Sequence, residues 1–378
     1  MKYRKIVCGS LLLLFLTGCK PEIPYIETTV SEEDFCDKFY YTILETEEEK
    51  LVYREVYEGL YNRQDEFYIH GMSEKVLNTV LDAIMYDYPE IFWYDAKTVV
   101  SYEMHEEFKE EYTIVRPDYA YSAEKVQEMK EKIEEATEEC IQECKEKDSD
   151  YEKVKFIYEY LIDNVEYVEG APDNQNIYSA LVSKESVCAG YAKSVQYLLE
   201  QVGIECITIT GEATDSEGDK ESHAWNVVNY ENDYFYVDAT WGDPEGQKEN
   251  TSRLMVYDYL CCSEAEISKT HKADKEEQLP ECTSEKFNYY RMKNMFYDSV
   301  DDSEILGAMK DSIAAKEKYT IFKFAAKEDY EEALKKMEDT LINDALDYLA
   351  RYYGLRQSNC NYEYDELLYR INIYWSYE

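Results

Sequence analysis

Residues 186–193 read Ser-Val-Cys-Ala-Gly-Tyr-Ala-Lys and place a cysteine, Cys188, at the start of a predicted helix. Apolar residues recur at helical spacing and give this helix a buried stripe that ends before Gly203: Tyr191, Val195, Leu198, Leu199 and Val202. The free N–H groups and the dipole at a helix N-terminus favour a thiolate over a thiol. A buried structural cysteine is nevertheless the commoner explanation for an arbitrary cysteine, so Cys188 needs a partner before it predicts chemistry.

A predicted β-hairpin downstream supplies that partner. Its first strand reads Ser222-His-Ala-Trp-Asn-Val-Val228, and its second reads Tyr234-Phe-Tyr-Val-Asp-Ala-Thr240. The chain has four histidines, and His223 is the one for which the sequence pattern predicts an aspartate, Asp238, within reach of the ring. The other explanation of the hairpin is a core histidine with an aspartate at a strand end.

The length of the hairpin loop decides how these two residues meet. A loop over 231–232 or over 230–233 places His223 opposite Thr240, and Asp238 is then its diagonal neighbour. A loop over 229–232 places His223 directly opposite Asp238. Both registers point the imidazole and the carboxylate to the same face, because strand side chains alternate with a period of two. A three-residue loop would separate them.

These motifs together resemble the transglutaminase-like superfamily. The resemblance rests on Cys188-Ala-Gly-Tyr-Ala, the helix end Gly203-Ile204, Gly211, His223-Ala-Trp-Asn and Asp238-Ala-Thr-Trp-Gly-Asp. More diffusely, Asp87-Tyr-Pro-Glu-Ile-Phe-Trp and residues 257–271 resemble bacterial exported proteins of this group. The resemblance implies an α+β fold with a papain-like core, in which the nucleophile helix packs on an antiparallel sheet. We expect a helical N-terminal flank and an α+β C-terminal flank.

The expected chemistry follows from the three side chains. Cys188 is the candidate nucleophile, His223 its acid and base, and Asp238 the group that orients and stabilises the imidazolium. Attack on an amide or glutamine side-chain carbonyl gives a thioester, which water or an amine resolves. The backbone N–H of Cys188 is the expected oxyanion donor, with a second one from the segment Gln175–Tyr178. Two further aromatic residues flank the site and either shield the thioester or belong to the core: Trp225 and Trp241.

The N-terminus predicts export. Three basic residues precede the apolar run 6–16, which suits a signal peptide better than a membrane span: Lys2, Arg4 and Lys5. The run ends in Leu16-Thr-Gly-Cys19, which resembles the bacterial lipobox. We expect removal of residues 1–18, lipidation of Cys19 and a lipid-anchored protein on the outer face of the cell membrane. An ordinary secretory signal with a chance cysteine is the alternative.

Composition excludes several classes of function. The 378 residues include 40 basic and 82 acidic side chains, a net charge of −42, so nucleic acid is not an expected partner. No Gly-rich nucleotide loop is present, and we expect no metal and no cofactor. The expected partners are a protein or peptide substrate at the cell surface and the membrane that holds the lipid. The oligomeric state is left open. The charge favours cationic or neutral acyl acceptors.

The remaining cysteines and histidines receive no chemical role. Nine cysteines follow Cys19 in the chain, an odd number, so at least one thiol is unpaired within the molecule. Cys140 and Cys144 are one helical turn apart and are interpreted as helix positions rather than metal ligands. We interpret three histidines as structural or surface residues: His70, His105 and His271. The last of these, in Lys269-Thr-His-Lys, matches a recurring position of the similar exported proteins.

We expect five regions along the chain: the signal 1–18, a tether 19–44, an N-terminal α+β region 45–150, the transglutaminase-like core 151–275 and a C-terminal α+β region 276–378. Helices are predicted over 52–60, from Ser73, from Ser122, over 154–161, over 187–202, from Ser303 and over 329–353. Strands are predicted at 205–210, 223–229, 234–240, 319–324 and 367–375, and strands or extended edges at 91–94, 98–102 and 112–115. A surface binding protein that uses the core as a scaffold is the alternative function.

Overall fold

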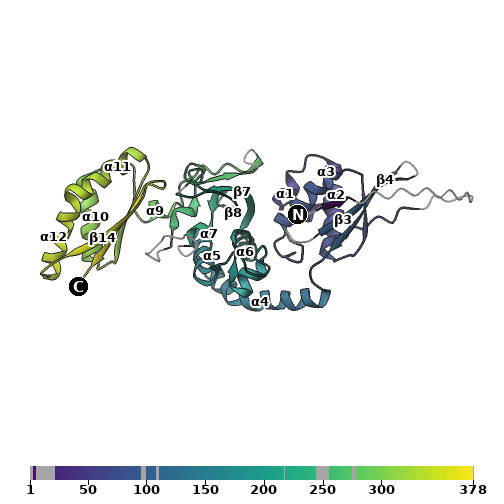
Figure 1. The fold of residues 1–378 in the computed structure, drawn as a ribbon, viewed down its shortest axis with the longest axis horizontal. Coiled ribbons are helices and arrows are strands. Elements are labelled where there is room, and N and C mark those ends of the chain that lie inside the picture. The colour runs from purple at the N-terminus through teal and green to yellow at the C-terminus, as the bar shows by residue number, and fades with distance from the viewer. Residues whose placement is uncertain are drawn as a thin grey trace, which may run out of the picture.

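The computed structural model describes residues 3–5, 22–94, 99–107, 110–216, 218–243, 255–274 and 278–377. They form three units in a row: an N-terminal unit, a central unit and a C-terminal unit (Figure 1). The buried residues of the first two units form one continuous apolar cluster. The C-terminal unit has an apolar cluster of its own. The site candidates with described positions all lie in the central unit.

The N-terminal unit packs two helices against a mixed β-sheet, in which one strand pair is parallel and two are antiparallel. α2 (Glu47–Tyr61) begins at a capping box made by Thr46 and Glu49, and α3 (Glu74–Asp87) begins at Ser73, whose side chain accepts from Val76 N. The sheet has the order β1-β3-β4-β2. Its strands are β1 (Tyr3–Lys5), β2 (Phe67–His70), β3 (Val99–Glu107) and β4 (Glu110–Asp118). This flank is therefore α+β, as predicted for the region 45–150. The expectation of a helical N-terminal flank was wrong.

The structure corrects two expectations in this unit. The expected tether 19–44 is packed from Tyr25 onward: Tyr25 bridges to Tyr68, and η1 (Glu32–Phe35) and α1 (Phe39–Thr42) contribute aromatic rings to the core. Burial of these rings outweighs the acidity of the segment. The expected strand 91–94 is a turn whose four side chains are all buried. Cys19 and residues 6–18 lie outside the described part of the chain.

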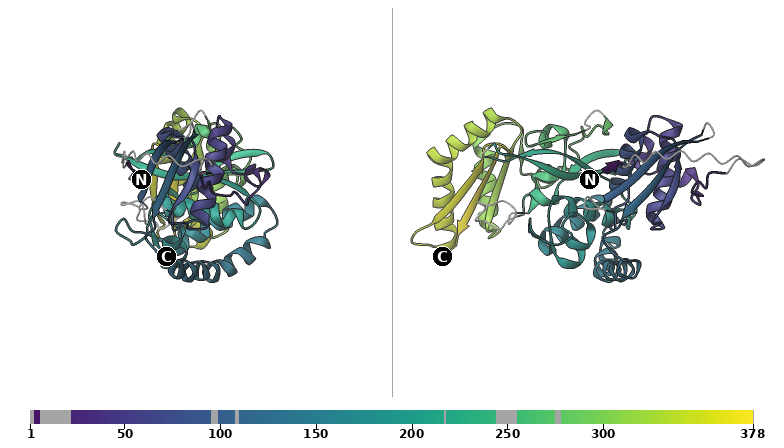
Figure 2. Two further views of the ribbon diagram at one scale, coloured as in Figure 1. Left: turned by 90° about the vertical axis from the view of Figure 1, so that its right-hand side faces the viewer. Right: turned by 45° about the vertical axis from the view of Figure 1, so that its right-hand side comes forward.

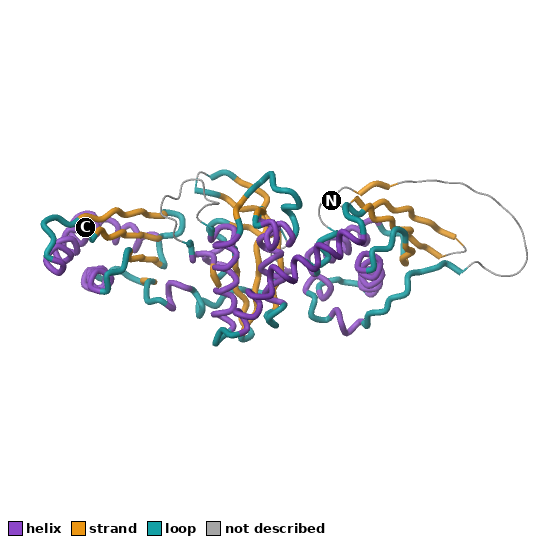
Figure 3. The backbone as a smooth tube through the Cα atoms, turned by 90° about the horizontal axis from the view of Figure 1, so that it is seen from below, coloured by secondary structure: helices purple, strands orange, loops and turns teal. Residues whose placement is uncertain are grey.

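Helix α4 (Ala123–Lys145) connects the N-terminal unit to the central one, as Figure 3 shows from below. Ser122 caps its N-terminus, as predicted, by accepting from Lys125 N. Its buried seam includes Val126, Met129, Ile133, Cys140 and Cys144. The two cysteines are thus core positions, as the sequence analysis had interpreted them.

The central unit packs helices on a five-stranded antiparallel sheet of order β10-β9-β8-β7-β11. The strands are β7 (Glu205–Thr214), β8 (Lys220–Tyr230), β9 (Asp233–Val237), β10 (Leu260–Cys262) and β11 (His271–Ala273). Helix α6 (Cys188–Glu200) lies against β7 and β8, and α5 (Asp150–Asn164) lies against α6. Shorter elements complete the unit: β5 (Glu166–Tyr167), the π-helix η2 (Ser179–Ser183), β6 (Glu185–Ser186), α7 (Ala239–Gly242), η3 (Tyr257–Tyr259) and α8 (Glu264–Ile267).

The C-terminal unit is a four-stranded sheet of order β12-β13-β15-β14 with helices on one face (Figure 2). It follows α9 (Tyr289–Met292) and contains β12 (Phe296–Tyr297), α10 (Asp302–Ala314), β13 (Tyr319–Phe324), β14 (Asn359–Asp365) and β15 (Arg370–Ser376). The predicted helix 329–353 is interrupted by a π-helical turn: α11 (Lys327–Lys336), η5 (Met337–Leu341) and α12 (Ile342–Tyr353). Strand β14 was not predicted.

A buried ionic cluster joins the C-terminal unit to the central one. The ammonium of Lys323, in β13, lies 2.7 Å from Asp258 and 3.0 Å from Glu266, and its side chain is fully buried. Arg370, in β15, pairs with the same Asp258. Asp258 belongs to η3 and Glu266 to α8, so the C-terminal unit holds two segments that lead to the candidate active site.

Candidate active site

Cys188 is the first residue of α6 and is partly exposed. The preceding residue, Val187, provides no side-chain cap, and the Gly190 N–H donates to Val187 O at 2.9 Å, so the N–H groups of Cys188 and Ala189 are the first-turn donors placed to meet a ligand. Positive dipole and free N–H groups therefore converge on the sulfur.

The small residue Gly190 allows the chain before α6 to fold closely over the start of the helix. A Cβ at this position would lie 1.9 Å from Ser186 Oγ. Ser186 Oγ also donates to Asn174 O at 3.1 Å and lies 2.6 Å from Ser179 Oγ. These contacts place the segment around Gln175 beside the N-terminus of α6.

The β8–β9 hairpin has a two-residue loop, Glu231–Asn232, and both residues have positive φ. This is the pattern of a type I′ turn, whose twist matches that of the strands. Asn226 pairs with Val237, which is the first of the two registers considered from the sequence. β9 ends at this Val237, because the side chain of the next residue, Asp238, caps α7: its Oδ1 accepts from Thr240 N at 2.9 Å and Trp241 N at 3.1 Å.

His223 and Asp238 meet inside the protein. Nε2 of His223 lies 2.7 Å from Oδ2 of Asp238, and both side chains are almost completely buried. Burial opposes the charge on His223, but the charge and hydrogen bond of Asp238, with a contribution from the Cys188 side chain, outweigh it and raise the pKa of His223 to about 10. Burial raises the pKa of Asp238, yet its interactions with His223 and His271 hold that pKa well below its usual range.

The side chain of Cys188 interacts with the same imidazole. Since Nε2 of His223 is bound to Asp238, Nδ1 is the nitrogen left for the thiol. The structure thus brings together the three residues that the sequence analysis had grouped. A proton can pass between Cys188 and His223 while Asp238 holds the other side of the ring.

A contact between Tyr191 and Asp243 holds the helix that carries Cys188 close to the segment that carries Asp238. Tyr191 lies one turn after Cys188 in α6, and its hydroxyl donates to Val165 O at 2.6 Å and lies 3.0 Å from Asp243 Oδ2. Asp243 follows α7 directly. The nucleophile helix is therefore tied to the short helix that Asp238 caps.

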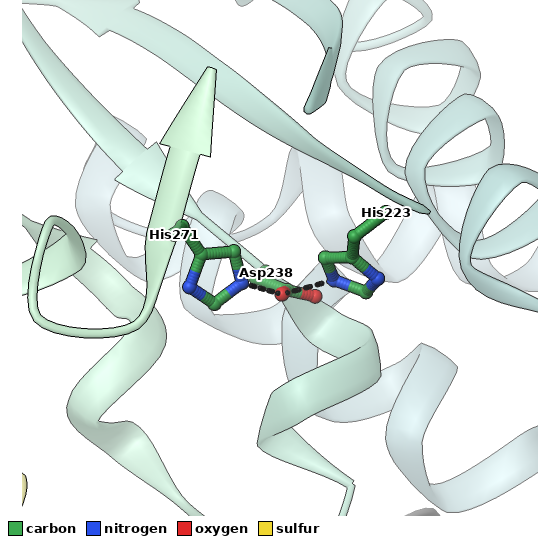
Figure 4. A group of neighbouring side chains, drawn as sticks. All are labelled: His223, Asp238 and His271. Atoms are coloured by element: carbon green, nitrogen blue, oxygen red, sulfur yellow. Dashed lines mark hydrogen bonds and ion pairs between the residues drawn. The ribbon is translucent and has the colours of Figure 1, made fainter. Parts of the chain in front are cut away.

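A fourth residue, His271, joins the site and was missed by the sequence analysis, which had treated it as structural or surface. It begins β11, and its Nε2 lies 3.0 Å from the same Oδ2 of Asp238 that binds His223 (Figure 4). Its side chain is fully buried. The available signal was its place in Lys269-Thr-His-Lys, a recurring position of the similar exported proteins, but nothing local to it indicates a carboxylate partner.

Aromatic rings surround the two histidines. Trp225 is buried, and its ring centroid lies 5.9 Å from that of His223 and 5.0 Å from that of His271. Trp241 is partly exposed and lies 5.9 Å and 4.7 Å from the same rings. Trp225 is thus a core residue, and Trp241 is placed to cover the site from the solvent side.

The two other candidate oxyanion residues differ in position. Gln175 is partly buried in the segment beside the start of α6, where its side-chain amide lies 3.4 Å from Asn174 Oδ1. The Tyr178 hydroxyl instead interacts with Lys132 of α4, and the Tyr178 N–H already donates to Asn176 Oδ1. This geometry corrects the expectation for Tyr178 and leaves Gln175 as the candidate from this segment.

The nine described cysteines are free thiols, and most of them are shielded from chemistry. Burial raises the pKa of Cys140, Cys261 and Cys282 to about 12 and that of Cys144 to about 11. It also raises the pKa of Cys206, Cys262 and Cys360. A thiol with a raised pKa is protonated near neutral pH and is a poor nucleophile.

One group among the described residues has metal-ligand composition: a nitrogen of His223, a nitrogen of His271 and an oxygen of Asp238 lie within 4.8 Å of one another. The carboxylate contacts at 2.7 and 3.0 Å are hydrogen-bond distances, so two N–H donors to one oxygen account for the arrangement. Within the described part of the chain, no helix is both long and apolar enough to cross a membrane.

Comparison with known proteins identifies the central part of the chain. Residues 138–239, which include Cys188, His223 and Asp238, match the model of the transglutaminase-like superfamily. Kyphoscoliosis peptidase of Mus musculus is 29% identical over 126 residues, and that of Homo sapiens is 28% identical over 109 residues. These matches cover 29% and 25% of this chain but only 18% and 16% of the relatives.

Two solved structures resemble the chain more distantly. A TGase structure has a TM-score of 0.28 and 14% identity, and the similarity covers 41% of this chain and 54% of that one. The periplasmic domain of TgpA from Pseudomonas aeruginosa has a TM-score of 0.23 and 15% identity over 34% of this chain and 53% of its own. The match to the family model over residues 138–239 shows that the central part of this α+β chain carries a transglutaminase-like superfamily core.

Proposed function

We propose that the protein is a cysteine-dependent enzyme that transfers or hydrolyses the acyl group of an amide through a thioester on Cys188. One observation carries the proposal. Cys188 lies at the N-terminus of α6 and shares the imidazole of His223 with the buried carboxylate of Asp238. A binding scaffold has no need of a partly exposed thiol, an imidazole and a carboxylate in that order.

The first half of the reaction forms the thioester. The thiolate sulfur attacks the amide carbonyl carbon, and the carbonyl electron pair moves to oxygen, where the N–H of Cys188 donates to it. The C–N bond then breaks, and His223 passes its Nδ1 proton to the departing amine. Asp238 stabilises the imidazolium before this step and keeps the ring oriented after it.

The second half resolves the thioester. Water or a second amine gives a proton to His223 Nδ1 and attacks the thioester carbon, and the sulfur leaves as thiolate. Water yields a carboxylic acid, and an amine yields a new amide. Both outcomes use the same residues, so the acceptor that reaches Cys188 decides between them. Trp241 is partly exposed beside His223 and is placed to limit the access of water.

The charge around the site favours a cationic or neutral acceptor. The net charge of the chain is −42. Burial raises the pKa of the Tyr167 hydroxyl, and two exposed acidic residues, Glu169 and Glu221, lie close enough to raise it further, as Cys188 does, so they also lie near the site. The negative potential attracts cationic amines and repels anionic ones, and salt screens the effect. A carboxylate-bearing amine that reacts faster than a neutral amine of similar size at low salt would contradict this preference.

The enzyme activity is tested with the purified full-length protein. We expect it to incorporate a fluorescent primary amine into a glutamine-containing protein, or to release ammonia or peptide when no amine is present. Cys188→Ala and His223→Ala should abolish both reactions, whereas Cys36→Ser, which changes an exposed thiol elsewhere, should leave them unchanged. Activity that survives Cys188→Ala would contradict the mechanism.

We further propose that a lipid on Cys19 anchors the protein to the outer face of the cell membrane. The motif Leu16-Thr-Gly-Cys19 after a basic and apolar leader supports this. The acidic surface is repelled by anionic lipid headgroups, so the anchor itself must hold the protein. Membrane association should be lost in Cys19→Ala. Retention of that variant in the membrane fraction after a salt wash would contradict the proposal.

A further inference from the structure

We propose that His271 is a positioning residue that acts through Asp238: it donates a second hydrogen bond to Oδ2 and keeps the carboxylate ionised and aimed at His223. The inference rests on the proposed function, because Asp238 has a catalytic task only if Cys188 and His223 react. Nothing about His271 requires contact with substrate, since its side chain is fully buried.

The hydrogen bonds of Asp238 determine where the protons are. An ionised carboxylate only accepts hydrogen bonds. It has four partners: Thr240 N and Trp241 N at Oδ1, and the Nε2 atoms of His223 and His271 at Oδ2. Both rings must therefore carry a proton on Nε2.

The second nitrogen distinguishes the two histidines. Nδ1 of His223 is left for the Cys188 thiol, and the ring gains a second proton when the ion pair forms. Nδ1 of His271 lies 2.7 Å from Thr270 Oγ1, whose one proton can be donated to this nitrogen rather than to the more distant Ile267 O at 3.3 Å. Burial, together with the charge on His223, outweighs the pull of Asp238 and lowers the pKa of His271. His271 is thus a neutral donor, and it orients the carboxylate without adding a positive charge that would compete with His223.

The position of His271 is fixed by the sheet. It begins β11, which pairs with β7 in the register His271 with Ala213 and Ala273 with Gly211. A Cβ on Gly211 would lie 2.1 Å from Lys272 O and 2.7 Å from the Trp225 ring. Three aromatic rings surround the imidazole: Trp225, Trp241 and Tyr259. Because this packing fixes the imidazole of His271, its hydrogen bond can in turn fix the orientation of the Asp238 carboxylate.

The test compares two substitutions of nearly equal length, His271→Gln and His271→Met. Gln can donate to Asp238 and Met cannot. The readout is the rate at which iodoacetamide alkylates Cys188, followed by mass spectrometry of its peptide between pH 4 and pH 9, so no substrate need be known. We expect His271→Gln to resemble the wild type. We expect His271→Met to react about tenfold or more slowly near pH 6, the effect of losing one hydrogen bond to a charged group.

The fall of the alkylation rate of Cys188 at low pH shows whether His271 positions Asp238 or only fills space in the core. The hydrogen bond from His271 lowers the pKa of Asp238. Without it, Asp238 takes up a proton at higher pH, the ion pair is lost, and the acid edge of the His271→Met profile should move upward. Equal profiles for Met and Gln would overturn the inference. A wild-type Cys188 that reacts no faster than in His223→Ala would instead overturn the proposed function.

A measurement on the unaltered protein covers the case in which the Met variant does not fold. With four histidines in the chain, selective ¹⁵N-histidine labelling gives a spectrum that can be assigned. We expect His271 to be neutral with its proton on Nε2 at pH 7. A charged ring, or a neutral ring protonated on Nδ1, would contradict the inference. So would a loss of Cys188 reactivity on chelation that Zn²⁺ restores, because the trio would then be a metal site.

Discussion

The hydroxyl of Tyr191 lies 3.0 Å from Oδ2 of Asp243, and this contact ties the helix of the nucleophile to the end of the segment that holds Asp238. The same hydroxyl donates to Val165 O. Tyr191→Phe removes both interactions and leaves the ring in place. We expect a loss of about 1–3 kcal/mol in the free energy of unfolding, because buried polar partners lose a hydrogen bond. Urea unfolding measures it, and Tyr352→Phe, an exposed residue, is the control. Equal stability in both variants would show that the contact is not formed.

The pH dependence of stability should report the ion pair of His223. Its pKa is raised from 6.5 to about 10, so the folded state binds the proton more tightly than the unfolded state. The contribution to stability is therefore complete below pH 6.5 and is lost as the pH rises through about 10. We expect the free energy of unfolding to fall by up to about 1.4 kcal/mol per pH unit in this window. His223→Gln should remove this component. A wild-type protein whose stability changes with pH exactly as the variant's does would contradict the ion pair.

Gly211 should be required for β11, which carries His271, to pack closely against β7. A Cβ at Gly211 meets the backbone of β11 and the ring of Trp225, neither of which can move freely. We expect Gly211→Ala to destabilise the protein by about 1–3 kcal/mol through overpacking. Gly307→Ala is the matched control, since nothing lies within 4 Å of its Cβ position and it is inside helix α10. That change should stabilise the protein by about 0.5–1 kcal/mol. Thermal melting checks that Gly211→Ala lowers the melting temperature and that Gly307→Ala raises it.

Lys323 should hold the C-terminal unit to the active-site unit. Lys323→Met keeps much of the side-chain volume but leaves Asp258 and Glu266 without the buried ammonium. Breaking a buried pair by removing one partner costs about 3–5 kcal/mol. Lys327→Met, which affects an exposed pair with Glu331, should cost about 1 kcal/mol or less. Similar losses in denaturant unfolding of the two variants would mean that the cluster does not support the interface.

The residues that carry local signals could be predicted from the sequence. Helix α6 has an apolar stripe and ends at Glu200, and the turn that follows it contains Gly203, whose φ of +79° is one that glycine tolerates best. The hairpin that brings His223 to Asp238 has strong strand patterns and a short loop. The choice between its registers depended on positive φ at Glu231 and Asn232, which the residue types alone do not force.

Other features depend on tertiary contacts that no local pattern contains. His271 reaches Asp238 only because β11 pairs with β7, so its partner cannot be read from its neighbours in the chain. The acidic segment 25–44 resembles a tether in composition, yet Phe35, Tyr40 and Tyr41 bury their rings. Strand β14 is an edge strand with mostly exposed side chains, and it has little apolar alternation to reveal it.

The most direct test of the account is whether Cys188 forms a thioester. The purified protein is mixed with p-nitrophenyl acetate near pH 6, quenched and digested, and the modified peptides are identified by mass spectrometry. We expect an acetyl group on Cys188 that hydroxylamine removes and that is absent in His223→Ala, because the thiolate needs the protonated ring beside it. Acetylation of Cys36 or surface lysines with Cys188 unmodified would contradict it.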